Sequence, residues 1–489
     1  MRASTPTRRR AYRRQGGIAL ATVLFLIVVL SVLAAAVLYS TQLETISAYN
    51  YGASTRALYV ADAGTQAAMN WFENNYTPQP STSYNTTYTP VQYGSAATVI
   101  DGTGNGSNYP DMTTVKSFQD ALGNFKMGNG AGKFNVNATL VALRPVTTIN
   151  GPGAQERWRL DTTGAYTVAG ISLATAKVSV FVEKSVTPVL NFAMFSLSKT
   201  CGSLVMSGGA QTDSYNSSKG TYAQTVSTTT GGDVGSDGNV QSSGNVTIGG
   251  NVLVPYGTVG KCGAGNPGSI TMNGGVTVSG KIYNMTAPIS YPSPIAPAAC
   301  VASLTCAAVP GTGVLAPATC TSPAPPSLPV CTPSYGDISL TSSANLTLPG
   351  GTPGNPAVYV VNSITQSGQA TISVSPAGPV ILKIVGSGTT APLTLTGGGV
   401  LNSSPPTNLL IEYGGTSSIS VTGGTTSNYV LYAPNAAVKV AGSAAVFGAI
   451  IGGTVDASGG APIHYDQALR NTYQQLGPFQ NVSWNRIVN

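Results

Sequence analysis

The sequence predicts a mainly β protein with one long N-terminal α-helix, followed by an α+β region and then a β-solenoid. Three observations support this fold class. Residues 18–39 form an uncharged, apolar run. Only 8% of all residues are charged, against roughly a quarter in ordinary soluble domains, and 59 are glycine. A short pattern recurs through the second half of the chain: two apolar residues separated by one residue, then one further residue, then glycine.

The apolar run begins at Ile18 and ends at Tyr39. At 1.5 Å per residue, a helix over this run crosses the ~30 Å core of a bilayer. The helical pattern continues without proline as far as Pro78, so we expect one helix over 18–74, ~85 Å long. Arginines precede the run and place the N-terminus in the cytoplasm by the positive-inside rule: Arg2, Arg8, Arg9, Arg10, Arg13 and Arg14.

The net charge of +7 comes mostly from these arginines. Without residues 1–17 the chain is nearly neutral. A basic surface that binds phosphate groups is therefore not expected on the rest of the chain, and no nucleic acid is predicted as a partner.

The apolar run has three alternative fates. It is a plain membrane anchor, or a secretory signal cut after Ala36, where Ala34 and Ala36 satisfy the small-x-small rule. The third alternative is a leader that is cut just before the run, so that the helix is retained. Gly17 lies between the basic stretch and Ile18, and the helix continues beyond the membrane. Both features favour the third alternative.

Two segments, RRQGGIALATVLFLIVVL and ALYVADAGTQAAMNW, resemble the N-terminal region of PilX-type minor pilins. The resemblance covers roughly the first 75 residues, and its distal part matches at Ala61, Asp62, Ala63 and Gly64. It implies cleavage by a prepilin peptidase between Gly17 and Ile18, with N-methylation of Ile18. It also implies that the helix packs with other pilins or pseudopilins, in the inner membrane first and later in a pilus or at the cell surface.

The fifth residue after the implied cleavage is Thr22. Major pilins carry Glu there, and its carboxylate pairs with the N-terminal amine of a neighbouring subunit. An unpaired carboxylate in a membrane costs several kcal/mol, so a subunit without that neighbour, at a filament tip, gains nothing from it. The alternative is that Thr22 is an ordinary membrane residue of a monomeric anchor.

Composition divides the remainder into four parts. Residues 75–130 are rich in Pro, Ser, Asn and Gly and predict a linker, with a short helix near 115–122. Residues 131–198 contain alternating strands at 133–144, 157–170 and 174–184, which the resemblance makes a pilin-like antiparallel region. Residues 199–470 are the predicted solenoid, and 471–489 a C-terminal tail.

The solenoid prediction depends on two alternating strand classes. The Gly-ended pattern occurs at 204–209, 246–251, 270–275, 276–281, 393–398, 419–424, 438–443 and, degenerately, 455–460. Aliphatic strands lie between its later copies, at 380–385, 409–413, 429–432 and 446–451. Such alternation is typical of stacked coils with glycine corners. The irregular spacing leaves a β-sandwich with Gly-rich turns as the alternative. Residues 285–335 interrupt the pattern and are predicted to project as a disulfide-stapled loop.

The six cysteines predict disulfides formed in an oxidising compartment. They are Cys201, Cys262, Cys300, Cys306, Cys320 and Cys331. No C-x-x-C pair occurs and His464 is the only histidine, so no metal site is predicted. The sequence does not choose among the pairings.

Parallel β-helices also include carbohydrate-active enzymes, which need clustered carboxylates. Acidic residues are sparse after residue 200. Asp233 and Asp237 suit either a Ca²⁺ site or the capping of turns, and capping is favoured. His464 and Asp466 share one face of a strand and suit a general base or, preferably, a structural pair. We therefore expect no enzyme, no catalytic residue and no cofactor.

The resemblance and the large β region together predict a minor pilus or pseudopilus subunit, with both a tip and a shaft position left open by the sequence. It would act in filament assembly, surface display or adhesion to a surface or carbohydrate ligand. One alternative is a membrane-anchored adhesin outside any filament. The other is a secreted β-helix carbohydrate enzyme released by cleavage after Ala36.

Overall fold

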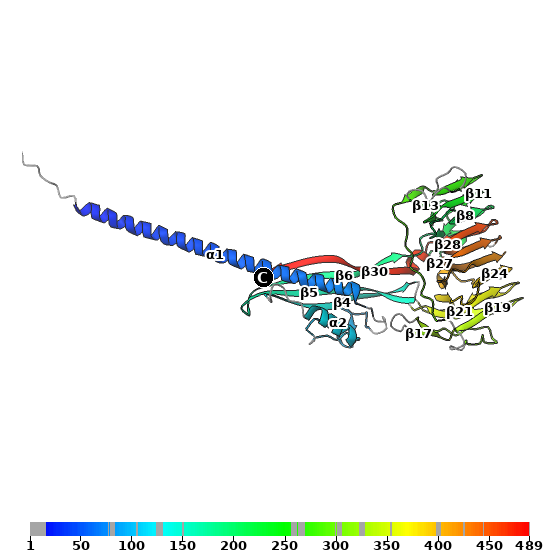
Figure 1. The fold of residues 1–489 in the computed structure, drawn as a ribbon, viewed down its shortest axis with the longest axis horizontal. Helices are drawn as coiled ribbons and strands as arrows, with labels where there is room; N and C mark the ends of the chain where they lie inside the picture. The colour runs from blue at the N-terminus through cyan, green and yellow to red at the C-terminus, as the bar shows by residue number, and fades with distance from the viewer. Residues whose placement is uncertain are drawn as a thin grey trace, which may run out of the picture.

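The computed structural model describes residues 16–76, 78, 84–103, 106–123, 131–148, 151–255, 262, 269–298, 300, 306–321, 328–352, 355–397, 402–423, 426–443 and 445–488. A long helix leads to a small antiparallel sheet, and a large sheet of parallel strands lies at the far end (Figure 1). The mainly β class with one long N-terminal helix is confirmed.

Helix α1 (Gly16–Asn74) has 59 residues and agrees with the predicted helix. It has no acidic residue in its first turn and no basic residue in its last, so charges at its ends do not stabilise it. Its second half is stabilised by packing instead, through the buried residues Ala57, Ala61, Ala68, Trp71 and Phe72.

The antiparallel sheet pairs its strands in the order β3–β4–β5–β6–β30, and the start of β30 also pairs in parallel with β4. Its strands are β3 (Val99–Asp101), β4 (Gly132–Thr148), β5 (Gly151–Val168), β6 (Ile171–Pro188) and β30 (Tyr473–Val488). The β5–β6 hairpin turns through Ala169 and Gly170, which both have positive φ, 49° and 84°. That pair of angles matches the turns whose twist suits a two-residue hairpin. The three alternating runs predicted within 131–198 correspond to β4, β5 and β6.

Two predicted boundaries around this sheet are wrong. The short helix predicted near 115–122 is confirmed as α2 (Met112–Gly123), but the rest of residues 75–130 is not simply a linker or loop, because it contains β1 (Gln92–Tyr93), β2 (Ala96–Ala97) and β3. Tyr109 and Phe118 from this region are buried in the core of the helix–sheet unit. Residues 471–489 are not a tail, because β30 pairs antiparallel with β6. The strand was missed because half of its described side chains are exposed and the strand shows little apolar alternation.

The parallel sheet has 19 strands, and its first series begins directly after β6. Equivalent strands of successive turns pair in parallel: β7 with β10, β10 with β13 and β13 with β16, and likewise β8–β11–β14 and β9–β12–β15. The strands are β7 (Met194–Ser196), β8 (Leu204–Ser207), β9 (Gln211–Tyr215), β10 (Val234–Ser236), β11 (Val240–Ser243), β12 (Thr247–Ile248), β13 (Val252–Pro255), β14 (Ile270–Asn273), β15 (Thr277–Val278) and β16 (Ile282–Met285).

A second series begins at the opposite end of the sheet and returns to the middle (Figure 1). It contains β19 (Tyr335–Leu340), β21 (Ala357–Gln366), β23 (Val380–Ile384), β24 (Leu393–Gly397), β25 (Leu409–Tyr413), β26 (Ile419–Gly423), β27 (Ser427–Ala441), β28 (Val446–Ser458) and β29 (Pro462–Asp466), with β20 (Asn345–Leu348) and β22 (Thr371–Val374) as a separate parallel pair. Its last strands stack on the first strands of the other series, β28 on β7 and β8, and β29 on β9. The order of stacking therefore differs from the order of the sequence. These parallel pairs do not fit a sandwich of antiparallel sheets.

Residues 286–334, the return segment, connect the two series and correct the prediction of a projecting loop. Tyr291 is buried beside Phe195, with 5.2 Å between ring centroids, and the hydroxyl of Tyr432 donates to Pro292 O at 2.6 Å. Farther along, Ala307 and Val314 form parallel bridges to β19 and β20, which lie at one end of the stack. The described part of this segment thus lies along the sheet and then covers its end. Its hairpin consists of β17 (Thr319–Thr321) and β18 (Val330–Thr332).

Glycines line one corner of the stack, where successive backbones touch. A Cβ on Gly397, which has φ +92°, would lie 2.6 Å from Gly368 O. The same kind of close approach recurs from turn to turn along a column of glycines: Gly368, Gly397, Gly423 and Gly442. This explains why the strand pattern in the sequence ends in glycine.

We expect Gly397→Ala to lower the free energy of unfolding by about 1–3 kcal/mol more than Gly388→Ala does. Gly388 also has positive φ, +69°, but has open space around its Cβ position. The control therefore carries the backbone strain without the collision. Urea denaturation followed by far-UV circular dichroism measures the free energy of unfolding of both variants. Equal destabilisation would contradict the close stacking at this corner.

Candidate functional site

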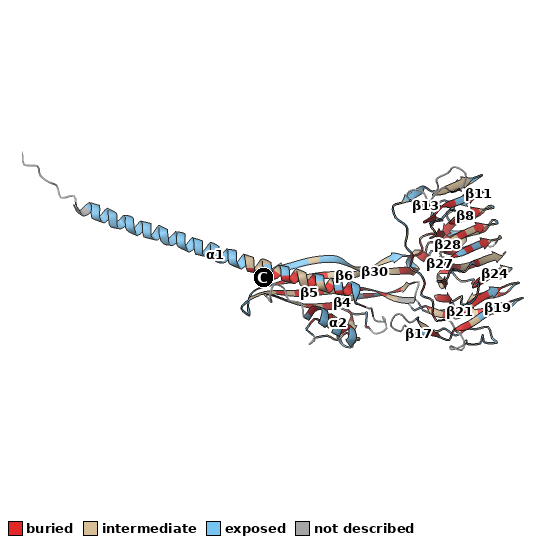
Figure 2. Cartoon of the chain, in the orientation of Figure 1, coloured by how far each residue is buried: buried red, intermediate tan, exposed pale blue. Residues whose placement is uncertain are grey.

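The first half of α1 is a bare apolar helix. Residues 18–51 are all exposed, including Ile18 at 76%, whereas the later turns are buried against the sheet (Figure 2). Within the part of the chain that the structure describes, α1 is the one helix long and apolar enough to cross a membrane. An apolar surface of this extent is unfavourable in water and needs lipid or other protein around it.

The residues of the predicted cleavage site are only partly described. Residues 1–15 lie outside the described residues, and Gly17 is described only as part of the α1 backbone. Thr22 is exposed, and its hydroxyl lies 3.0 Å from both Ile18 O and Ala19 O. One of these two helical carbonyls therefore accepts a hydrogen bond from the Thr22 hydroxyl. Thr22 consequently needs no partner from another chain in an apolar environment.

Small residues bring α1 into close contact with β5. Ala61 is fully buried, and a Cβ on Gly164 of β5 would lie 2.8 Å from Ala61 Cα. On the next turn, a Cβ on Gly64 would lie 2.6 Å from the ring of Phe134 and 2.9 Å from Thr162 Cγ2. Two residues of the predicted family-like segment are thus the points where helix and sheet touch. Gly164 was missed, although a glycine inside an alternating strand is a signal of close backbone approach.

Polar contacts flank this apolar contact. Asp62 forms an ion pair with Arg486 of β30 at 2.9 Å, and Thr65 Oγ donates to Thr162 Oγ at 2.9 Å. The Arg486 side chain is 53% exposed, so the pair contributes only about 0–1 kcal/mol. Ala63 is half-buried beside the contact. The polar groups therefore orient the helix more than they stabilise it.

An aromatic cluster holds the end of α1. Trp71 and Phe72 pack against Phe118 and Trp158, with Trp71–Phe118 centroids 4.8 Å apart. Inside the cluster, buried Glu156 accepts hydrogen bonds from Tyr76 Oη at 2.5 Å and Trp158 Nε1 at 2.8 Å. Burial raises the pKa of Glu156, while these hydrogen bonds act in the opposite direction. The arrangement ties the last turn of α1 and Tyr76, just beyond it, to β5.

All six cysteines are paired, as Cys201–Cys262, Cys300–Cys306 and Cys320–Cys331. The last pair joins directly opposite residues of β17 and β18. Among the described residues, no group of three or more His, Cys, Asp and Glu side chains is placed to hold a metal ion.

His464 pairs with Asp213 and not, as predicted, with Asp466. The two residues lie opposite each other on β29 and β9, with His464 Nδ1 2.7 Å from Asp213 Oδ1. Asp213 also accepts a hydrogen bond from Tyr222 Oη at 2.6 Å. Asp466 instead accepts from the backbone amides of Ser217 and Ala468. The contact joins β29, the final strand of the parallel sheet in the sequence, to β9 of the first turn in the sequence. Sequence could not reveal it, because 251 positions separate the partners.

Asp233 and Asp237 do not converge on one site. Asp233 Oδ1 accepts from the backbone N–H of Asn251 at 2.7 Å, and Asp237 Oδ1 accepts from that of Ile289 at 2.9 Å. Each carboxylate accepts from a backbone amide of another segment, 18 and 52 positions along the chain, so these hydrogen bonds join segments and are not the predicted turn caps.

Comparison with known proteins gives one family model and a solved pilin structure. A family model described as a domain of unknown function (DUF7305) matches residues 335–472, from β19 to α4 (Leu469–Thr472). The crystal structure of the competence-associated pilin ComZ from Thermus thermophilus aligns with 13% identity, over 89% of this chain and 98% of that chain, at a TM-score of 0.28. At this TM-score no feature of that protein is transferred to this chain. No curated protein matches the sequence.

We expect Gly164→Ala to destabilise the helix–sheet unit by about 1–3 kcal/mol, because its Cβ would push against the α1 backbone. Gly52→Ala is the matched control: its Cβ meets nothing within 4 Å, and alanine favours the helix by up to about 1 kcal/mol. All three tryptophans, Trp71, Trp158 and Trp484, lie in α1, β5 and β30. Denaturation followed by their fluorescence therefore reports on this unit. A Gly164→Ala protein as stable as the Gly52→Ala protein would contradict the contact.

Proposed function

We propose that this chain is a PilX-type minor subunit of a type IV pilus or related pseudopilus, whose parallel β domain is a β-solenoid displayed at the filament tip. The observation that carries the proposal is the division of α1 into two halves. Residues 18–51 are exposed and apolar over most of their length, while residues 53–74 are fixed on an antiparallel sheet. A helix of this kind supplies an assembly surface that is rigidly joined to a folded head.

The exposed half of α1 has two environments in this proposal. Before assembly it crosses the inner membrane, with the head outside the cytoplasm. In the filament it packs among the helices of other pilins, where apolar side chains replace lipid. A prepilin peptidase first removes residues 1–17 and leaves Ile18 as the N-terminus.

The shape of the head supports a tip position. The parallel stack lies at the end of the molecule opposite the start of α1, and it extends across the helix direction (Figure 1). Such a broad head crowds a shaft built from many closely spaced copies, but it is unhindered at an end. The internally satisfied hydroxyl of Thr22 agrees with a subunit that offers no carboxylate to a neighbour.

The bare helix alone also suits a membrane-anchored adhesin outside any filament. The docked small-residue face of α1 favours the pilus subunit, since a plain anchor needs no long rigid helix beyond the membrane. We propose no catalytic role: His464, Asp213, Asp233 and Asp237 are each engaged in contacts between neighbouring segments.

Processing at Gly17 predicts a mature chain that begins at N-methylated Ile18. Intact-mass spectrometry of protein from membrane and sheared surface fractions measures this terminus. Gly17→Arg is expected to leave the leader attached and to keep the protein out of the sheared fraction, whereas Gly16→Ala is processed normally. An uncut N-terminus in the native protein would support the anchored adhesin. A terminus at Val37 would support secretion instead.

Thr22→Glu is expected to reduce the amount of this subunit in sheared filaments. The new carboxylate lacks a partner amine at the tip, and leaving it unpaired in an apolar environment costs several kcal/mol. Thr41→Glu is the control, because Thr41 makes the same kind of hydrogen bond to the preceding turn but lies beyond the apolar run. Immunoblotting of membrane and sheared fractions measures how much of each variant is in filaments relative to the membrane. Unchanged incorporation of the Thr22→Glu protein would oppose the tip position.

A further inference from the structure

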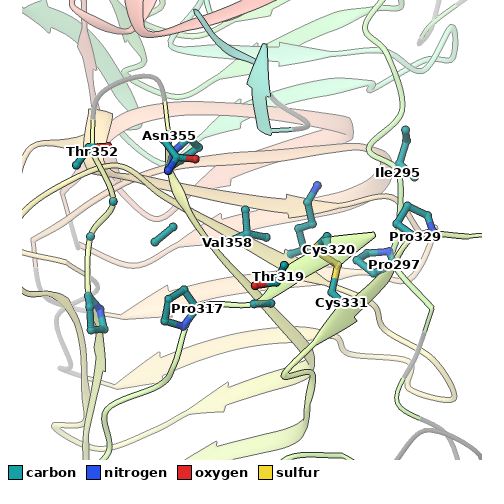
Figure 3. A pocket seen from close by; sticks show the side chains of 17 residues that line it. Ile295, Pro297, Pro317, Thr319, Cys320, Pro329, Cys331, Thr352, Asn355 and Val358 are labelled. Carbon is teal, nitrogen blue, oxygen red and sulfur yellow. A yellow bond between two sulfur atoms is a disulfide. The ribbon is translucent and has the colours of Figure 1, made fainter. Parts of the chain in front are cut away.

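A cavity of ≈ 640 Å³ lies between the return segment and the parallel sheet. Figure 3 shows Thr352 and Asn355 toward one end and the Cys320–Cys331 disulfide toward the other, with Val358 and Thr319 between them. Its volume is in the range of small-ligand sites, about 300–1,000 Å³. The cavity shares no residue with the helix contact described above, so it is independent of the proposed assembly function.

A buried ion pair lies at the cavity. Lys383 of β23 lines it, and Lys383 Nζ is 2.5 Å from Oε2 of Glu412, the directly opposite residue of β25. The two side chains are only 9% and 1% exposed. A buried ion pair is often no more stabilising than an apolar pair of the same size. Stability alone therefore gives little reason for its presence at this position.

The pair supplies hydrogen-bond donors without a net charge. The Lys383 ammonium has three donors, and its hydrogen-bond partner among the described residues is Glu412. The other oxygen of Glu412, Oε1, is buried and has no partner within the described part of the chain. A neutral ligand with an acceptor oxygen fits beside the Lys383–Glu412 pair, because an anionic ligand would add a second carboxylate beside Glu412.

The walls are apolar and conformationally restricted. Five prolines contribute to them: Pro297, Pro317, Pro329, Pro349 and Pro356. The hairpin that forms one wall is closed by the Cys320–Cys331 disulfide. Rings with fixed φ and a cross-linked hairpin lose little entropy when a ligand binds. No described lining residue is aromatic, so the flat face on which a sugar ring usually stacks is absent from this lining.

The hairpin also offers backbone groups. Strands β17 and β18 pair only with each other among the described strands, and residues 319–321 are exposed. Just before the two strands, the Ala318 amide donates to Val358 O at 2.7 Å and Pro329 O accepts from the Ala298 amide at 2.9 Å. The outer backbone groups of the strands themselves remain as an edge to which an extended peptide can add. This edge favours a peptide over a small organic molecule.

We propose that this cavity binds a short, uncharged peptide segment in extended conformation, with one peptide carbonyl accepting a hydrogen bond from the Lys383 ammonium. Small and proline-containing segments fit the narrow apolar walls. The site makes the parallel domain a peptide-recognition module.

The test uses the full-length protein in detergent and three probes: N-acetyl-Ala-Pro-Ala-amide, propionate and N-acetylglucosamine. Saturation-transfer NMR detects binding, and titration gives the Kd. We expect the blocked tripeptide to bind more tightly than either comparator. The double variant Lys383→Met/Glu412→Gln is expected to weaken tripeptide binding about tenfold or more, the effect of losing a hydrogen bond to a charged group. It leaves no buried charge unpaired.

Two further variants complete the test. Lys439→Met removes an exposed lysine of the same sheet and is expected to leave the Kd unchanged. Ala318→Trp fills the cavity without altering the ion pair and is expected to abolish binding, so the proposal stays testable if the double variant fails to fold. Absence of tripeptide binding, tighter binding of propionate or N-acetylglucosamine, or an unaltered Kd in the double variant or in Ala318→Trp would each overturn the proposal.

Discussion

The structure depends on one constraint: the parallel domain must begin and end at neighbouring points. It is inserted between β6 and β30, which are adjacent strands of the antiparallel sheet. The stacked strands form a ladder with β16 at one end and β19 at the other, roughly 40 Å apart at ~4.8 Å per strand. A stack built in sequence order would therefore end far from its start. The chain instead starts and finishes in the middle of the stack. Where the chain enters and leaves the stack, the Val189 amide donates a hydrogen bond to Tyr473 O at 3.2 Å.

The return segment follows from the same constraint. Because the first series grows toward one end and the second begins at the other, the chain must cross the whole stack between β16 and β19. It does so along the outer face of the sheet, where Tyr291 and Pro292 contact Phe195 and Tyr432. Outward side chains that would otherwise face solvent are thereby buried. The Lys383–Glu412 pair and the cavity above it lie in this covered region, so the cavity is a consequence of the insertion.

Local pattern predicted the elements well and their assembly poorly. Apolar length predicted α1, alternation predicted β4 to β6, and the glycine-ended repeat corresponds to strands that stack in parallel. Periodicity reports only how a segment is buried, however, and carries no information about which turn lies next to which. The stacking of β28 on β7 and the His464–Asp213 pair therefore required the structure. For the helix contact, the sequence indicated Ala61 and Gly64 by resemblance, but not Gly164, the partner of Ala61.

The insertion also determines how force reaches the helix if the head binds a surface. Both connections to the parallel domain leave the antiparallel sheet at the same end, through β6 and β30. Tension on the head therefore pulls both strands in the same direction and does not separate them one hydrogen bond at a time. The load passes to β5 through its long pairing with β6, and from β5 to α1 at the Ala61–Gly164 contact. A close, small-residue contact suits this role, because it lets many atoms of the two backbones share the load. The glycines that bring α1 and β5 together thus join the exposed half of α1, the proposed assembly surface, mechanically to the head.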